Sequence, residues 1–199
     1  NGDPSIMGTI FVDNLEPQSG TSLTLGASGD TIALHSGAHH SNFLEPTFLA
    51  YLSSNQDNIA HATFTKVQFD TVTYQTGSTF DTSNNRWTPG VAGKYWIFSS
   101  VSMKATSSDQ YINLRKTSAQ LYKNGSVTAN PEIRTRLDFN DSNIQAATAN
   151  DFTSTLQGTI SLTATDYLEV FGMRENANGT NQGRFEGSVS YFGGYRIGS

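Results

Sequence analysis

Short apolar stretches separated by turn residues recur from about residue 46 to the end of the chain. The strongest apolar stretch is KYWIFSSVSM, residues 94–103. Side chains alternate between the two faces of a strand, so Trp96 and Phe98 would share one face while Tyr95 and Ile97 share the other. Both faces are apolar at the start of this strand, which indicates a central strand that is covered on both sides. We expect the opposite sheet to cover one face and a second copy of the chain to cover the other.

Turn signals divide the remaining apolar stretches into segments of strand length. Gly90 and Gly93 bracket a turn before the strongest stretch, and Asn124-Gly125 is typical of a tight β-hairpin. No segment keeps a helical period of 3.6 residues over three turns. About ten short strands with regular turns predict an all-β, antiparallel sandwich of two sheets.

The N-terminal region has a different pattern. The segment 19–25 is followed nine residues later by the similar segment 28–34, and each has a Ser-Gly turn before a short alternating strand. One such strand buries too little surface to be stable alone, whereas three chains side by side would form a short β-shaft. The apolar residues that we expect at this interface are Leu23, Leu25, Ile32 and Leu34. We therefore predict an N-terminal extension, shaft and linker over residues 1–45 and a globular domain over residues 46–199.

Two resemblances to known families follow from these motifs. The segment around residues 19–38 resembles pieces of bacteriophage tail-fibre and related virion proteins that join an attachment part to a globular head. The motifs WTPGVAGKYWIF at 87–98, LYKNG at 121–125 and FEG at 185–187 are similar, in the same order, to those of the C1q-like domain, which is related in fold to the tumour necrosis factor family. Two places depart from that pattern. Pro89 and Val91 are one place apart from the usual arrangement, and Thr165 replaces the Gly of the usual Gly-Asp turn.

Membership of the C1q-like family would imply a ten-stranded jelly roll that assembles as a compact homotrimer and that binds rather than catalyses. It would also place Trp96 and Phe98 at the threefold interface, which explains the second apolar face of their strand.

Composition and motifs narrow the function further. The chain carries a net charge of −5 and few clustered Lys or Arg residues, which argues against a nucleic-acid partner. It has no cysteine, so disulfides and thiolate metal sites are excluded. No apolar run approaches the roughly 20 residues of a membrane span. The sequence contains no Gly-x-Ser-x-Gly, phosphate-binding loop or His-Glu-x-x-His motif, and a triad built on His61 is supported by no spacing, so we expect neither an enzyme nor a cofactor.

Two segments contain groups that can bind metals. His35, His39 and His40 lie close together, but they have no carboxylate or thiol partner at a defined spacing. The oxygen-rich segment 138–143 lacks the glycine and the distal glutamate of a calcium loop. A solvated linker and a polar turn explain these segments, and we predict no metal site.

Long polar segments at 104–118, 128–154 and 174–184 predict exposed loops, and long loops on a rigid scaffold are where binding residues usually lie. Aromatic and Arg side chains dominate binding hot spots. The candidate receptor-binding residues are therefore Tyr111, Arg134, Arg136, Asp138, Phe139 and Asp141.

Two classes of function fit these observations. The first is a virion fibre protein, extracellular on the particle, whose trimeric head binds host carbohydrate or protein while the chain contacts other virion structural proteins. The second is a secreted adhesion or matrix module of a cell with the same head. The repeat at 19–34 favours the first class, and the absence of a collagen-like stalk disfavours the second. A catalytic depolymerase is the weakest reading.

Overall fold

The computed structural model describes residues 15–20, 23–26, 28–31, 46–105, 114–129, 131–138, 151–176, 179 and 183–198. The chain divides into two compact units, Asn1–Ser41 and Asn42–Ser199. In the first unit, Leu15, Leu23 and Leu25 are exposed, and the residues described there belong to no strand. Ile32 and Leu34 lie outside the described residues. A β-shaft formed by neighbouring chains therefore stays a prediction.

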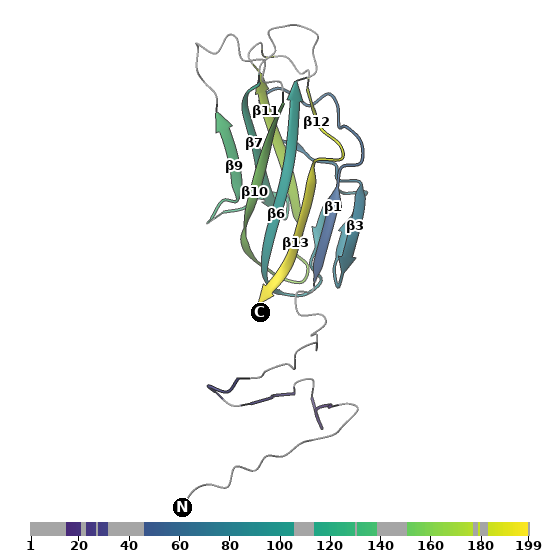
Figure 1. Ribbon diagram of the computed structural model, residues 1–199, viewed down its shortest axis with the longest axis vertical. Helices are drawn as coiled ribbons and strands as arrows, with labels where there is room; N and C mark the ends of the chain where they lie inside the picture. The colour runs from purple at the N-terminus through teal and green to yellow at the C-terminus, as the bar shows by residue number, and fades with distance from the viewer. Residues whose placement is uncertain are drawn as a thin grey trace, which may run out of the picture. The chain divides into compact units, whose positions relative to one another are not determined.

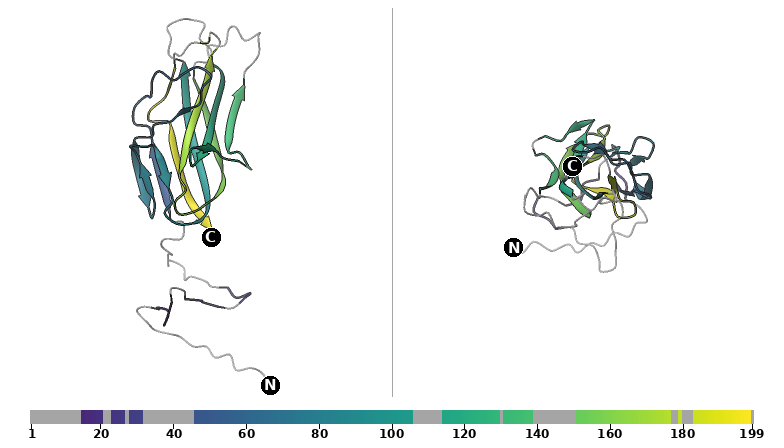
Figure 2. Two further views of the ribbon diagram at one scale, coloured as in Figure 1. Left: turned by 180° about the vertical axis from the view of Figure 1, so that it is seen from behind. Right: turned by 90° about the horizontal axis from the view of Figure 1, so that it is seen from above.

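The second unit is an all-β sandwich of two antiparallel sheets, as the sequence predicts (Figures 1 and 2). Sheet A has the order β10 (Asp151–Leu162), β6 (Gly93–Ala105), β13 (Tyr191–Gly198), β1 (Thr47–Tyr51) and β3 (Thr71–Thr76), and β12 (Gly183–Phe185) also pairs with β6. Sheet B has the order β4 (Thr79–Asp81), β5 (Arg86–Thr88), β11 (Leu168–Asn176), β7 (Leu114–Lys123) and β8 (Ser126–Val127), with β2 (Thr65–Lys66) on β11 and β9 (Arg134–Asp138) on β7. No helix occurs among the described residues.

The core between the sheets is built around stacked aromatic rings. Phe48 of β1 stacks on Trp87 of β5 with ring centroids 4.4 Å apart, and its ring meets the edge of Phe192 at 4.9 Å. Tyr95 of β6 packs edge-on against Trp87. All four side chains are fully buried, so these rings join β1, β6 and β13 of sheet A to β5 of sheet B. Because Tyr95 points into this core, Trp96 and Phe98 of the same strand must point away from it.

The predicted hairpin at Asn124-Gly125 is confirmed. Both residues have positive φ, 54° and 76°, as a tight turn between paired antiparallel strands requires. The turn next to it forms without the glycine of the C1q-like pattern, because Asp166 organises it. This carboxylate accepts hydrogen bonds from the Thr163 amide and from the Asn124 side chain, each at 2.7 Å.

The three predicted loops are shorter than expected, because strands occupy their ends. β6 extends through Ala105, β11 ends at Asn176, and β9 with the start of β10 occupies part of 128–154. The sequence pattern does not predict the strand β9, for a physical reason. β9 is an edge strand with one face in solvent, so its exposed positions are charged and it carries too few apolar residues to be recognised.

Candidate functional site

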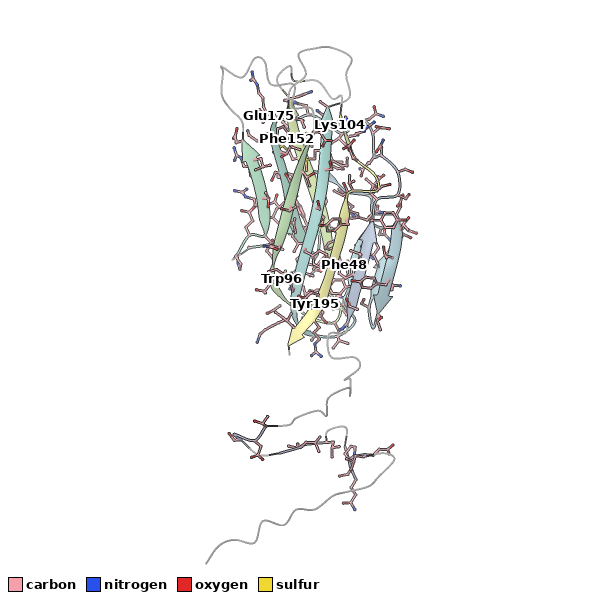
Figure 3. All side chains as sticks on the ribbon, viewed as in Figure 1. Phe48, Trp96, Lys104, Phe152, Glu175 and Tyr195 are labelled. Atoms are coloured by element: carbon pink, nitrogen blue, oxygen red, sulfur yellow. The ribbon has the colours of Figure 1, made fainter. Side chains whose placement is uncertain are left out.

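The outer face of sheet A carries a continuous set of partly exposed aromatic side chains. Trp96 and Phe98 point outward from β6, and cross-strand pairing places Tyr195 beside Trp96 and Leu49 across Gly193 from Phe98. Figure 3 labels Trp96 and Tyr195 near one end of β6 and Lys104 near the other. The residues that we call the aromatic face are Leu49, Tyr51, Tyr74, Trp96, Phe98, Tyr191 and Tyr195.

Exposure shows that this face is unusual for a surface. Tyr191 and Tyr74 are 40% and 47% exposed, and Trp96 and Phe98 are only partly buried. Phe98 meets Tyr191 at a centroid distance of 6.3 Å, so the rings form one surface. The other end of the same face is polar, because Ser100, Ser102 and Lys104 are the next residues on the outward side of β6. Contiguous exposed apolar surface of this kind marks an interaction site.

A groove lies along the open edge of the sandwich, where β10 borders sheet A and β8 borders sheet B. Its volume is about 450 Å³, and its walls include Val127, Pro131, Ile133 and Ile160, with Lys123 at the rim. Val127 is 41% exposed, whereas Ile133 is buried. The Lys123 ammonium is held by Asp166 at 2.8 Å and by the carbonyl of Ser161 at 3.2 Å. The groove is therefore lined by polar as well as apolar residues, and the charge of Lys123 at its rim is already paired.

Three of the predicted receptor-binding residues lie together on β9, at the edge of sheet B. Arg134, Arg136 and Asp138 share its exposed face, with the arginine side chains 44% and 49% exposed. Asp138 accepts a hydrogen bond from Arg136 at 2.9 Å and lies 3.7 Å from Lys116 of β7. The hydrogen bond from Arg136, against a smaller opposing effect of burial, lowers the pKa of Asp138 below its ordinary value.

The β9 face continues into a pair of aromatic rings on the outer face of sheet B. Tyr122 of β7 and Phe171 of β11 stack with centroids 4.0 Å apart. Burial and the nearby charge of Glu132 raise the pKa of Tyr122. Glu132 in turn lies 3.4 Å from Arg134 and accepts a hydrogen bond from Gln120. No sequence pattern predicts this stacked pair, because each ring lies in a different strand and only the pairing of β7 with β11 brings them together.

The other predicted residues have different outcomes. Tyr111, Phe139 and Asp141 lie outside the described residues, as do His35, His39 and His40. Among the described residues, no group of three or more His, Cys, Asp or Glu side chains is arranged to hold a metal ion. The same part of the chain contains no helix of the length and apolarity needed to cross a membrane.

The aromatic face also includes residues that no sequence pattern predicts to lie there. Leu49, Tyr74, Tyr191 and Tyr195 come from strands far apart in the chain. The aromatic residues Tyr191 and Tyr195 of the last strand are visible in the sequence. Their outward direction became evident only from the pairing of β13 between β6 and β1.

Comparison with known proteins supports the fold. No protein-family model matches the sequence, and no curated protein matches it either. Among solved structures, the globular domain of the zebrafish complement 1qA protein is similar with a TM-score of 0.50 and 14% sequence identity, over 77% of this chain and 98% of that one. The Eiger TNF of S. frugiperda aligns with a TM-score of 0.49 and 10% identity, over 78% of this chain and 95% of that one. The globular unit thus has the C1q-like jelly-roll fold that the order of its motifs predicts.

Proposed function

We propose that this chain is a virion fibre protein whose globular unit forms a homotrimeric head that attaches the particle to a host surface. The observation that carries the proposal is the aromatic face of sheet A. Seven apolar or aromatic side chains from β1, β3, β6 and β13 share this face. Covering them with a second copy removes apolar surface from water, which stabilises the assembly by roughly 25 cal/mol per Å² of that surface.

The sandwich also has a second patch, which a closed ring of subunits requires. In a cyclic assembly of three, each subunit presents two different, complementary surfaces to its neighbours. The aromatic face presents large rings, whereas the groove beside β10 is a hollow with Val127, Ile133 and Ile160 among its lining residues. The two patches lie on different parts of one subunit, so a heterologous contact between neighbours uses both.

The β9 face is the proposed attachment surface. It lies on sheet B, on the opposite side of the sandwich from the aromatic face, so burial of the aromatic face leaves it in solvent. Exposed Arg134 and Arg136 lie on the same outer face of sheet B as the rings of Tyr122 and Phe171, and this combination suits a carbohydrate or protein ligand. Three copies in one head strengthen weak binding by about 10² to 10⁴ through avidity.

The virion assignment rests on the repeat at 19–34 and on its resemblance to fibre segments. The alternative is a secreted adhesion module with the same head. Immunogold electron microscopy with antibodies against the chain separates the two, because a fibre protein labels particles and a secreted module labels cell surfaces or matrix.

Assembly is tested by light scattering coupled to size-exclusion chromatography of the full chain. We expect the mass of a trimer for the natural chain and a shift toward monomer for the double variant Trp96→Ser, Phe98→Ser. Phe171→Ser is the matched control, because Phe171 is equally half-buried but lies on the outer face of sheet B. A folded natural chain that is monomeric at micromolar concentration would refute the proposal.

A further inference from the structure

Two carboxyl groups on the outer face of sheet A meet at one hydroxyl. The Ser102 hydroxyl of β6 lies 3.1 Å from Asp151 Oδ1 of β10 and 3.3 Å from Glu186 Oε2, which follows β12. Ser102 is only 3% exposed, so its side chain is enclosed by these groups. A hydroxyl has one proton to donate and therefore serves one carboxylate at a time. With both carboxylates ionised, two like charges face each other and one hydrogen bond is missing.

Two cations form ion pairs with Glu186, while the charge of Lys104 acts on Asp151 as a smaller effect than burial. Lys104 of β6 lies 3.7 Å from Glu186 Oε1, and Arg184 of β12 lies 3.1 Å from the same atom. Glu186 is thereby held ionised, and Asp151 is the member of the pair that gains a proton. The outward titratable residue of β13 at this end is Tyr191, which pairs with Ser100 and brings no opposing charge.

The direction of titration agrees with this geometry. Burial, and then the hydrogen bond with Glu186, raise the pKa of Asp151 above its ordinary value. For Glu186, burial raises the pKa, but hydrogen bonds from Asp151 and Arg184 and the charge of Lys104 outweigh it, so the pKa falls. One proton between two carboxyl groups is the expected state of such a pair in mild acid.

The pair lies on the surface that the proposed assembly buries. Ser102 and Lys104 follow Trp96 and Phe98 on the same outward face of β6, and Asp151 pairs directly with Lys104. Covering this face removes water from the carboxyl groups, which penalises the doubly ionised state most. The assembled state then binds the proton more tightly than the free subunit does, so assembly takes up protons.

We propose that Asp151 and Glu186 share one proton beside Ser102 and that this shared proton makes association through the aromatic face stronger in mild acid than at neutral pH. The inference rests on the proposed assembly. The sign follows from linkage: the group with the raised pKa contributes below that pKa, and its contribution is lost as pH rises through it. Each unit by which assembly raises that pKa corresponds to a tenfold change in the association equilibrium per subunit.

The test is sedimentation equilibrium of the full chain between about pH 8 and about pH 4, where the lower limit is close to the ordinary pKa of Asp. We expect association of the natural chain to strengthen roughly tenfold per subunit on acidification. The neutral side chain of Asp151→Asn mimics a protonated carboxyl group at every pH. This variant should therefore associate at neutral pH as the natural chain does in acid, and its association should depend little on pH. Glu175→Gln is the control, because Glu175 pairs with Lys116 on sheet B, and it should retain the full dependence.

The control also accounts for the change in the net charge of the chain on acidification, which acts on every variant alike. If the natural chain and Asp151→Asn show the same pH profile, the inference is overturned. If the natural chain is monomeric at every pH, the proposed assembly fails, and a carboxyl ¹³C NMR titration decides the remaining point. Asp151 titrating in the ordinary range would overturn the shared proton as well, whereas a raised, two-step titration coupled to Glu186 upholds the shared proton and overturns only its effect on assembly.

Discussion

The ring of Phe98 on β6 lies across Gly193 on the neighbouring strand β13. A Cβ atom added to Gly193 would come within 2.6 Å of Phe98 Cζ and 3.1 Å of Leu49 Cδ1. The missing side chain at Gly193 is therefore what lets the aromatic face form a continuous surface from β6 to β1. Gly193 is buried although it lies on the outer face, because these two side chains cover it.

Gly193→Ala should weaken assembly more than it weakens folding. The close atom is the far end of a flexible side chain, so the ring of Phe98 can turn away at little cost to the sandwich. We expect the thermal midpoint to change by only a few degrees while association falls by at least about tenfold, the equivalent of 1.4 kcal/mol. Gly198→Ala is the control, because nothing lies within 4 Å of its added Cβ. Equal association of both variants would contradict the role given to Phe98.

Trp87→Ala should cost more folding stability than Trp96→Ala. Trp87 is fully buried and stacked on Phe48, and removing such a side chain typically costs about 3–5 kcal/mol. Trp96 lies on the aromatic face and is only partly buried in the single subunit. Urea unfolding of dilute, unassembled protein measures both values. A larger loss for Trp96 under those conditions would mean that the single subunit is not the folding unit.

Gly187→Ala should destabilise the sandwich. Its added Cβ would lie 2.6 Å from the backbone carbon of Ser54, which cannot move as a side chain can. The Gly187 amide also donates to Asn55 at 3.0 Å, so the two segments are held together there. Overpacking of this kind costs about 1–3 kcal/mol. Chemical denaturation of Gly187→Ala beside Gly198→Ala checks the value, and equal midpoints would show that the segment relaxes freely.

Asp166 should make folding stability dependent on pH in acid. Burial opposes its ionisation, but hydrogen bonds from Lys123, from the Thr163 amide and from Asn124 outweigh burial and lower the pKa of Asp166 well below its ordinary value. A carboxyl group with a lowered folded-state pKa contributes stability above its unfolded pKa, near pH 4, and loses it as pH falls toward the folded pKa.

Asp166→Asn should therefore lose about 1–3 kcal/mol at neutral pH, the usual worth of hydrogen bonds to a charged group. Its unfolding free energy should also fall less than that of the natural chain between about pH 5 and about pH 2. Asp57→Asn serves as the control, because Asp57 is an exposed carboxylate away from this turn. Parallel acid dependence in all three proteins would rule out the assigned role.

Arg134→Ala with Arg136→Ala should weaken binding to the host surface without disturbing assembly. Both side chains are partly exposed on β9, on the sheet opposite the aromatic face, so their removal leaves that face intact. Losing two hot-spot arginines typically costs more than about 1 kcal/mol each, and avidity multiplies the effect on whole particles. Adsorption of the trimeric variant to host cells measures it, with Arg86→Ala, a 39% exposed cation on β5 of the same sheet, as the control. Unchanged adsorption would place receptor recognition elsewhere.

The alternating pattern of the sequence determined the class of fold and the central strand. Tyr95 and Ile97 alternate with Trp96 and Phe98, and this period alone fixes which residues point to the core once one face is buried. The Asn124-Gly125 turn is also predicted by the sequence, because a turn with positive φ at two successive residues favours Asn and Gly at those positions. These features depend on neighbours within a few residues, which a sequence displays directly.

Pairing between distant segments decided the rest. The aromatic face joins residues of β1, β3, β6 and β13, and the carboxyl pair joins Asp151 to Glu186 across β6. The sequence pattern predicts a loop at β9, because the exposed positions of this strand are charged. Leu137 is its only apolar residue, and only pairing with β7 half-buries it. Strand order and register set these relationships through contacts between residues far apart in the chain. Such contacts leave no local period in the sequence, so only the tertiary structure could specify them.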